Sequence, residues 1–426
     1  MLKAINKENR QELKDYLQSR SSGISADILI KTNDIIEDVR TNQDQAVKKY
    51  TRNFDGVDLQ DLQVSRQEIE EAAAKADPAF RKALEQAASN IRDFHVLQKQ
   101  DGYRLEKEMG IYLGQRVIPL DSVGIYVPGG RAQYPSSVLM NAIPAKVAGV
   151  KRIVMVTPPS KEGTLHPNIA AAALCAGVDE IYKVGGAQAV AALAYGTESI
   201  APVDKIIGPG NIFVAAAKKL VFGQVDIDMI AGPSEILVIA DEKADPACTA
   251  ADLLSQAEHD PMASAVLLSN SQKLIDQVNE QLRLQTDQLP KKSIVEESLK
   301  NYGTSILCGS LEECVEISNA VAPEHLELQT EQFEQLLPLV KHAGSVFLGY
   351  STCESVGDYF GGTNHVLPTS GTARFSSALS VDAFVKKSSY LYYSDQAIQA
   401  YGAQIVKMAE EEDLQAHANA VKVRMK

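Results

Sequence analysis

The chain has 426 residues, of which 45% are hydrophobic and 23% charged, so it is long enough to form two or more domains with sizeable cores. Its formal net charge of −13 argues against a nucleic acid or an anionic membrane as partner, because either would need a concentrated basic surface. No apolar run approaches the roughly 18–20 residues that span a bilayer, and the first residues show no secretory signal. These properties predict a globular protein without a membrane segment.

The cysteines bear on the cellular compartment. There are five of them, an odd number, and none forms a C-x-x-C pair. Such usage is typical of free thiols in a reducing environment, so the expected location is the cytoplasm.

Apolar periodicity predicts the elements in chain order. The first hundred residues favour helices, because apolar side chains recur at spacings of three and four. From Val117 onward, short apolar strands alternate with alanine-rich helices, the pattern of a parallel α/β sheet. Two such series follow one another, separated by the turn AGPSE near residue 232, and a β-rich segment near Phe384 leads into helices at the end of the chain. The sequence therefore predicts two α/β units in tandem.

Glycine-rich turns end several of the predicted strands. GGAQ and GPGN are candidate cofactor loops, because backbone N–H groups at a helix start bind phosphate well, but neither matches G-x-G-x-x-G, and both also fit plain βα turns. Tyr126, Gln188 and Asn211 beside these turns could bond a ribose or an amide; a core position for Tyr126 and helix capping by the other two remain open. Ser234 of AGPSE stands at the mouth of a strand, where α/β proteins gather ligands.

One helix ends in two potential metal ligands. Asp245 is a favoured N-cap and Pro246 a tolerated first residue, so a helix is predicted from Pro246 to about His259. Asp252, Gln256 and His259 then share one face. A polar helix end facing solvent is the alternative, because a metal site needs three or four ligands.

Acidic and histidine side chains recur in three later segments. In NAVAPEHLELQ, Glu324 and His325 open a strand, and a carboxylate beside an imidazole can work near neutral pH, although such neighbours are common. Asp358 and His365 lie in the glycine-containing loop ESVGDYFGGTNHVLPT. Near the end, Glu412 precedes His417 on a charged helix that also fits a solvated face. The nitrogen and oxygen ligands that would together suit zinc are Gln256, His259, Asp358 and His417.

The chain resembles the histidinol dehydrogenase family along nearly its whole length. The resemblance is carried, in order, by VGIYVPGGRAQYPSS, GGAQAVAALAYGT, GPGN, IDMIAGPSEILVIAD, DLLSQAEHD, APEHLEL, GDYFGGTNHVLPT and EDLQAHANAV. It implies a zinc-dependent enzyme that oxidises L-histidinol to L-histidine through L-histidinaldehyde and reduces two NAD⁺, the last step of histidine biosynthesis.

The same resemblance implies a role for individual residues. Glu324 and His325 would be the acid–base pair, and Tyr126, Gln188 and Asn211 would bind NAD⁺. One zinc ion per subunit would be held by Gln256, His259, Asp358 and His417. The substrate would contact these four ligands together with Ser234, His325, His365 and Glu412.

The resemblance also bears on assembly and domain division. The last segment would reach into a partner's site in a homodimer, although whether Glu412 and His417 act in their own chain stays open. The expected fold is two incomplete Rossmann-like parallel-sheet domains with a small N-terminal helical segment and a C-terminal arm. The expected boundaries are 1–25 for the helical segment, 26–125 with 235–380 for the first α/β domain, 126–234 for the second, NAD-binding domain, and 381–426 for the dimerisation arm.

Two rival functions use the same residues differently. In a zinc hydrolase, Glu324 would activate water at an open metal site without a nicotinamide, and the glycine-rich turns count against this reading. In an inactive metabolite-binding or scaffold protein the fold would persist without chemistry. The intact set of ligand and acid–base residues counts against that second rival.

Overall fold

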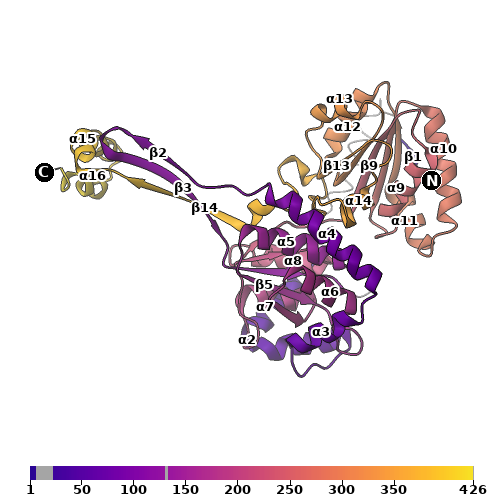
Figure 1. Cartoon of the computed structure of the whole chain (residues 1–426), viewed down its shortest axis with the longest axis horizontal. Helices are drawn as coiled ribbons and strands as arrows, with labels where there is room; N and C mark the ends of the chain where they lie inside the picture. The colour runs from indigo at the N-terminus through magenta and orange to yellow at the C-terminus, as the bar shows by residue number, and fades with distance from the viewer. Residues whose placement is uncertain (6–22, 130–132, 426) are drawn as a thin grey trace.

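A computed structural model of the chain describes residues 1–5, 23–129 and 133–425. Within these ranges the strands form a six-stranded parallel sheet, a five-stranded parallel sheet and a three-stranded antiparallel ribbon. Figure 1 shows the two parallel sheets in adjacent bodies and the ribbon reaching away from them toward the C-terminal helices. The expected α/β class with two parallel-sheet units is confirmed.

The five-stranded sheet has the order β6-β5-β4-β7-β8. Apart from the two-residue edge strand β8, its strands are largely buried on both faces, as in a sheet covered by helices on each side, and Val154 and Met155 of β5 are inaccessible to solvent. Because the chain adds strands on both sides of β4, the carboxyl ends of β4 and β7 form the crevice where such sheets bind ligands. The elements are β4 (Ser122–Tyr126), α5 (Pro135–Ala148), β5 (Arg152–Thr157), α6 (Pro167–Ala176), β6 (Glu180–Lys183), α7 (Gly186–Tyr195), β7 (Lys205–Ile207), α8 (Ile212–Val221) and β8 (Asp226–Ile227).

The six-stranded sheet has the order β1-β11-β10-β9-β12-β13. Its helix α9 begins as expected, with the Asp245 side chain accepting the N–H of Ala247, but it ends two residues before His259. The elements are β1 (Lys3–Ala4), β9 (Glu235–Ala240), α9 (Pro246–Ala257), β10 (Ser264–Ser269), α10 (Gln272–Thr286), α11 (Lys292–Tyr302), β11 (Gly303–Leu307), α12 (Leu311–Val321), β12 (His325–Gln329), α13 (Phe333–Leu336), β13 (Ser345–Leu348) and α14 (Glu354–Tyr359).

In the described residues, three N-terminal helices pack on the helices that flank the five-stranded sheet. Helix α2 (Ala26–Asp55) packs on α7 and α8, α3 (Arg66–Ala74) on α6, and α4 (Pro78–Val96) on α5. The expected division groups 26–125 with 235–380 and stays a prediction, although these three helices contact the helices of the five-stranded sheet. The physical reason lies in the apolar faces: Ile36 and Val39 of α2 share a buried core with Val190 and Ala191, and the alanine-rich surface of α7 permits close approach.

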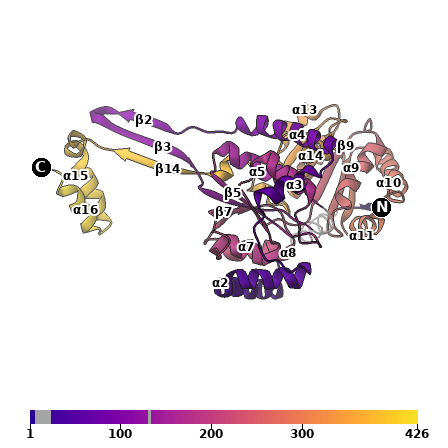
Figure 2. The same ribbon diagram turned by 60° about the horizontal axis from the view of Figure 1, so that its bottom comes forward.

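The ribbon and the last helices form an arm. Strand β3 (Ile111–Pro119) pairs with β2 (Tyr103–Lys107) on one side and with β14 (Val385–Tyr392) on the other. Helices α15 (Asp395–Glu411) and α16 (Gln415–Lys422) pack together at its tip, far from both bodies in Figures 1 and 2. The arm thus includes residues 103–119 in addition to the expected 381–426.

Two expectations concern the chain start and the membrane. Most of the expected N-terminal helical segment, residues 6–22, lies outside the described residues, while Lys3–Ala4 pair with β11 as a short strand. Among the helices that the structure describes, none has the length and apolar character needed to cross a bilayer.

Candidate active site

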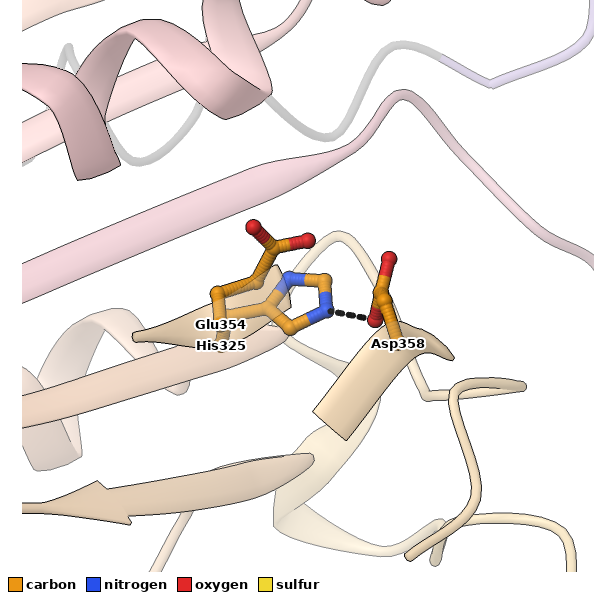
Figure 3. A group of neighbouring side chains, drawn as sticks. All are labelled: His325, Glu354 and Asp358. Atoms are coloured by element: carbon orange, nitrogen blue, oxygen red, sulfur yellow. Dashed lines mark ion pairs between the residues drawn. The ribbon is translucent and has the colours of Figure 1, made fainter. Parts of the chain in front are cut away.

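The expected acid–base pair stands at the amino end of β12. The ring of His325 is buried, and its Nδ1 lies 2.9 Å from the carbonyl oxygen of Glu235. Because a carbonyl oxygen only accepts hydrogen bonds, Nδ1 carries a hydrogen, and the Nε2 of a neutral ring is the atom that can take a proton. This Nε2 has no hydrogen-bond partner among the described residues and lies 3.5 Å from Oδ1 of Asp358 (Figure 3).

Glu324 and His325 influence each other's protonation. The Glu324 carboxylate lies 3.7 Å from Nδ1 of His325 and accepts the N–H of Glu235 at 2.9 Å. Burial raises the pKa of Glu324 to about 8, although the neighbouring imidazole acts in the opposite direction. Burial alone would lower the pKa of His325, but the negative charges of Glu324 and Asp358 outweigh it and raise the value to about 10. Strongly shifted pKa values of two buried neighbouring groups mark this pair as a candidate functional site.

Asp358 and His365 join this pair from the segment that follows β13. Burial would raise the pKa of Asp358, but the neighbouring His325 and the charge of His365 lower it to about 2. Nδ1 of His365 lies 2.9 Å from the backbone oxygen of Asp358, and its Nε2 lies 3.3 Å from Oγ of Ser137 on α5. His365 therefore connects the two bodies, and the site lies at their junction.

Glu354 is a site residue that the sequence analysis missed. His325, Glu354 and Asp358 each offer one ligand atom, and these atoms lie within 4.8 Å of one another (Figure 3). Burial and the nearby Asp358 raise the pKa of Glu354 to about 7. The available signal was the spacing of four between Glu354 and Asp358, which places both on one face of α14.

Gln256 and His259 approach the site from α9. Gln256 is 1% exposed, and neither atom of its amide has a hydrogen-bond partner in the described part of the chain. An unpaired buried polar group costs about 1–3 kcal/mol and is rare, so it points to a missing ligand. The neighbouring Ser255 donates to Glu354 at 2.9 Å, which ties this end of α9 to α14. His259 follows the helix, where partial withdrawal from solvent lowers its pKa while the charge of Asp358 acts in the opposite direction.

Glu412 and His417 do not join the other candidates within one chain. Both are exposed, at the end of α15 and on α16, respectively. These helices occupy the tip of the arm, at the opposite end of the molecule from α14 (Figures 1 and 2).

The expected cofactor residues lie at the carboxyl edge of the five-stranded sheet. The hydroxyl oxygen of the buried Tyr126 accepts the N–H of Gly186 at 3.0 Å. Gln188 is inaccessible to solvent, and its amide, like that of Gln256, has no partner among the described residues. Asn211 caps α8 by accepting the N–H groups of Phe213 and Val214, so its capping role is confirmed.

Ser234 directly precedes β9, opposite the start of β12. Its backbone oxygen accepts the N–H of Ser264 at 3.0 Å, and the residue is half-buried. This position places Ser234 beside Glu235, whose N–H and carbonyl groups bond Glu324 and His325.

Comparison with known proteins identifies the family. The family model described as histidinol dehydrogenase matches residues 18–425. The chain belongs to the histidinol dehydrogenase family. A histidinol dehydrogenase of Clostridium acetobutylicum is 56% identical over 410 residues, which cover 96% of this chain and 95% of that protein. A histidinol dehydrogenase of Bacillus subtilis is 53% identical over 390 residues, covering 92% and 91% of the respective chains.

The fold agrees with that of a solved family member. A crystal structure of histidinol dehydrogenase from Elizabethkingia anophelis matches with a TM-score of 0.94 at 42% sequence identity. The match covers 100% of this chain and 98% of that one. The resemblance seen in the sequence motifs is thereby confirmed, and the histidinol dehydrogenase fold extends over the bodies and the arm.

Proposed function

We propose that this protein is a zinc-dependent, NAD⁺-linked L-histidinol dehydrogenase. It oxidises L-histidinol to L-histidine through L-histidinaldehyde, reduces two NAD⁺, and completes histidine biosynthesis in the cytoplasm. Family membership supports the reaction, and the single structural observation that carries it is the Nε2 of His325, which has no hydrogen-bond partner in the described part of the chain and lies at the junction of the two sheets.

The donor set fits a zinc ion. Gln256, His259 and Asp358 supply oxygen and nitrogen atoms of the kinds that zinc binds, and the buried, unpaired amide of Gln256 is satisfied by such a ligand. His417 is proposed as the fourth ligand. When bound, the ion supplies a positive charge that orients the substrate. This charge also draws electron density from the nitrogen atoms that bind the ion. His325 belongs to the alternative group with Glu354 and Asp358, but an Nε2 that binds metal cannot also accept protons, so we assign it to catalysis.

His325 and Glu324 then divide the proton transfers between them. In the first oxidation His325 takes the alcohol proton at Nε2, because its Nδ1 is held by the Glu235 carbonyl. Glu324 takes a proton from the water that hydrates the aldehyde, and His325 acts again as base in the second oxidation. NAD⁺, when bound, accepts the hydride in each oxidation.

The remaining expected residues bind the two small molecules. Tyr126 and Gln188 form an enclosed polar wall at the carboxyl edge of the five-stranded sheet, and the unpaired amide of Gln188 offers bonds to NAD⁺. Asn211 is proposed to add to this contact through its free amide nitrogen while its oxygen caps α8. Ser234, His365 and Glu412 are proposed to contact the substrate.

A homodimer would complete the site. The arm carries Glu412 and His417 away from its own chain's site, and it exposes large apolar side chains such as Leu391, 70% exposed, and Met408, 69% exposed. Exposed apolar side chains that cluster on an extended arm favour association with another chain. The partner's arm then supplies Glu412 and His417.

The reaction is tested by following NADH formation with L-histidinol and NAD⁺. Two NADH per histidinol, loss of activity with a chelator and its return with zinc are expected. A zinc hydrolase would bind the metal and form no NADH, and an inactive binding protein would bind histidinol without turnover. Either outcome would contradict the proposed function.

A further inference from the structure

Two more polar side chains follow His325 on the same face of β12. Alternate residues of a strand point to the same side, which groups Glu327 and Gln329 with His325. Glu327 is inaccessible to solvent and Gln329 is 3% exposed. A buried carboxyl group is costly unless it is fully bonded, so Glu327 calls for an explanation beyond packing.

Glu327 is bonded to the start of α14. Its Oε1 accepts the backbone N–H of Glu354 at 2.9 Å, and its Oε2 accepts Nε2 of Gln329 at 2.8 Å. The same Nε2 donates to Oδ2 of Asp252 on α9 at 2.7 Å, and Oε1 of Gln329 accepts the hydroxyl of Thr249 at 2.5 Å. One buried network therefore links α9, β12 and α14.

Each linked element carries a residue of the site. On α9, Asp252 precedes Gln256 by one helical turn, and on α14, Glu354 precedes Asp358 by one turn. On β12, Glu327 follows His325 by two residues. Glu327 joins α14 to the rest of this network through its two carboxylate oxygens, in addition to the direct bond from Ser255 of α9 to Glu354.

We propose that Glu327 is a positioning residue that fixes α14, and with it Asp358, relative to His325 and to the ligands on α9. Glu327 makes its contact through the backbone N–H of Glu354 and is itself inaccessible to solvent. Outer groups that orient metal ligands typically change metal affinity or activity about 10–100-fold when they are removed. This inference rests on the proposed function where it treats Asp358 as a zinc ligand.

The test compares full-length wild-type protein with Glu327→Leu and Glu327→Gln. Leucine removes both bonds of the carboxylate, whereas glutamine keeps an oxygen for the Glu354 N–H. Zinc affinity is measured by competition with a chromogenic chelator; kcat is measured with L-histidinol, and KM is measured for both L-histidinol and NAD⁺. Glu327→Leu is expected to weaken zinc binding about 10–100-fold and to lower kcat with little change in KM for NAD⁺, and Glu327→Gln to recover part of both losses.

A core variant separates positioning from stability. Val278 of α10 is fully buried among apolar side chains and lies outside the network, so Val278→Ala lowers Tm without touching it. Zinc affinity and kcat of Val278→Ala should stay at the wild-type level below its Tm. If Glu327→Leu does not fold, Gln329→Met, which removes the bonds to Glu327 and Asp252, takes its place.

The outcomes distinguish this inference from the proposed function. A folded Glu327→Leu protein with reduced Tm but wild-type zinc affinity and kcat would overturn the positioning role. A wild-type protein that forms NADH but binds no zinc would overturn the proposed metal. The kcat of Glu327→Leu would then decide whether Glu327 has a positioning role. A wild-type protein that forms no NADH would contradict the dehydrogenase itself.

Discussion

At the residue scale, the chemistry depends on how each nitrogen and oxygen is committed. The Glu235 backbone uses its carbonyl to hold Nδ1 of His325 and its N–H to hold one oxygen of Glu324. The atoms left for the proposed acid–base roles are Nε2 of His325 and the second carboxylate oxygen of Glu324. A single residue at the start of β9 thus orients both members of the pair.

Glu324→Gln should separate the two oxidations. The amide keeps the oxygen that accepts the Glu235 N–H but cannot take a proton from water, so aldehyde oxidation should fall about 10²–10⁴-fold, and alcohol oxidation much less. Rates are measured separately with L-histidinol and with L-histidinaldehyde. If the rates of alcohol oxidation and aldehyde oxidation fell by the same factor, Glu324 would not be the residue that activates water.

Gln188→Met should weaken NAD⁺ binding without destabilising the ligand-free protein. The substitution removes a buried amide that lacks partners, so Tm should hold or rise, while the loss of bonds to NAD⁺ worth about 1.4 kcal/mol lowers affinity about tenfold. Thr51→Val, at a buried polar position on α2, is the control and should leave NAD⁺ affinity unchanged. If NAD⁺ bound Gln188→Met with the wild-type affinity, the cofactor would not contact Gln188.

Individual site residues differed in how far the sequence could reveal them. Glu324 and His325 were singled out because an adjacent acid and imidazole open a predicted strand, but such neighbours are common, and their proposed acid–base role came from the family resemblance. Glu354 was missed because its spacing of four to Asp358 indicates only a shared helix face, whereas its burial beside His325 depends on how α14 packs against β12. The sequence also left open whether Asn211 is a cap, and the bonds to Phe213 and Val214 decide that point.

At the element scale, the loop that carries His365 is anchored by its neighbour Asn364. The Asn364 amide donates to the carbonyl of Met140 at 2.7 Å, accepts the N–H of Val366 at 2.9 Å and lies 3.3 Å from Nε2 of the buried His95. Nδ1 of His95 is committed to the carbonyl of Ile91 at 2.7 Å. These bonds fix the orientation of the Asn364 amide, whose N–H group faces Nε2 of a neutral His95.

Stability should depend on pH through His95. Burial lowers its pKa below the usual value of 6.5, so the fold favours the neutral ring. The contribution of neutral His95 to the free energy of unfolding is fully present above pH 6.5. It is lost as the pH falls below 6.5, because His95 binds a proton more strongly in the unfolded chain than in the folded one. His95→Gln should flatten this part of the curve of unfolding free energy against pH. A variant curve parallel to that of the wild type across this range would show that His95 does not titrate in this way.

The helices and strands themselves were more predictable than the elements that each of them packs against or pairs with. Period-two and period-3.6 patterns, with Asp245 as a cap, predicted the alternation of strands and helices and the start of α9. The partner of α2 was not predictable, because an apolar stripe on a helix shows that it is buried but not against which sheet. Nor does a strand pattern indicate which strand it pairs with, so the pairing of β3 with β14 in one ribbon was not expected.

At the scale of the whole molecule, the arm explains why two expected site residues stand apart from the rest. Tyr112 and Tyr392 stack in the ribbon with ring centroids 4.9 Å apart, which stiffens the arm that carries α15 and α16. The sequence motif around His417 predicted a site residue, but only the course of the ribbon shows that it is carried away from its own chain's α14. A two-chain site follows if His417 is a ligand.

The most direct test of this two-chain site mixes a His417→Ala chain with a His259→Ala chain. Each homodimer lacks one proposed ligand in both sites, whereas a mixed dimer has one intact site. Random exchange makes half of the dimers mixed, so activity should return to about a quarter of the wild-type level in the NADH assay. No recovery after subunit exchange has been verified would place His417 in its own chain's site and contradict the exchanged arm.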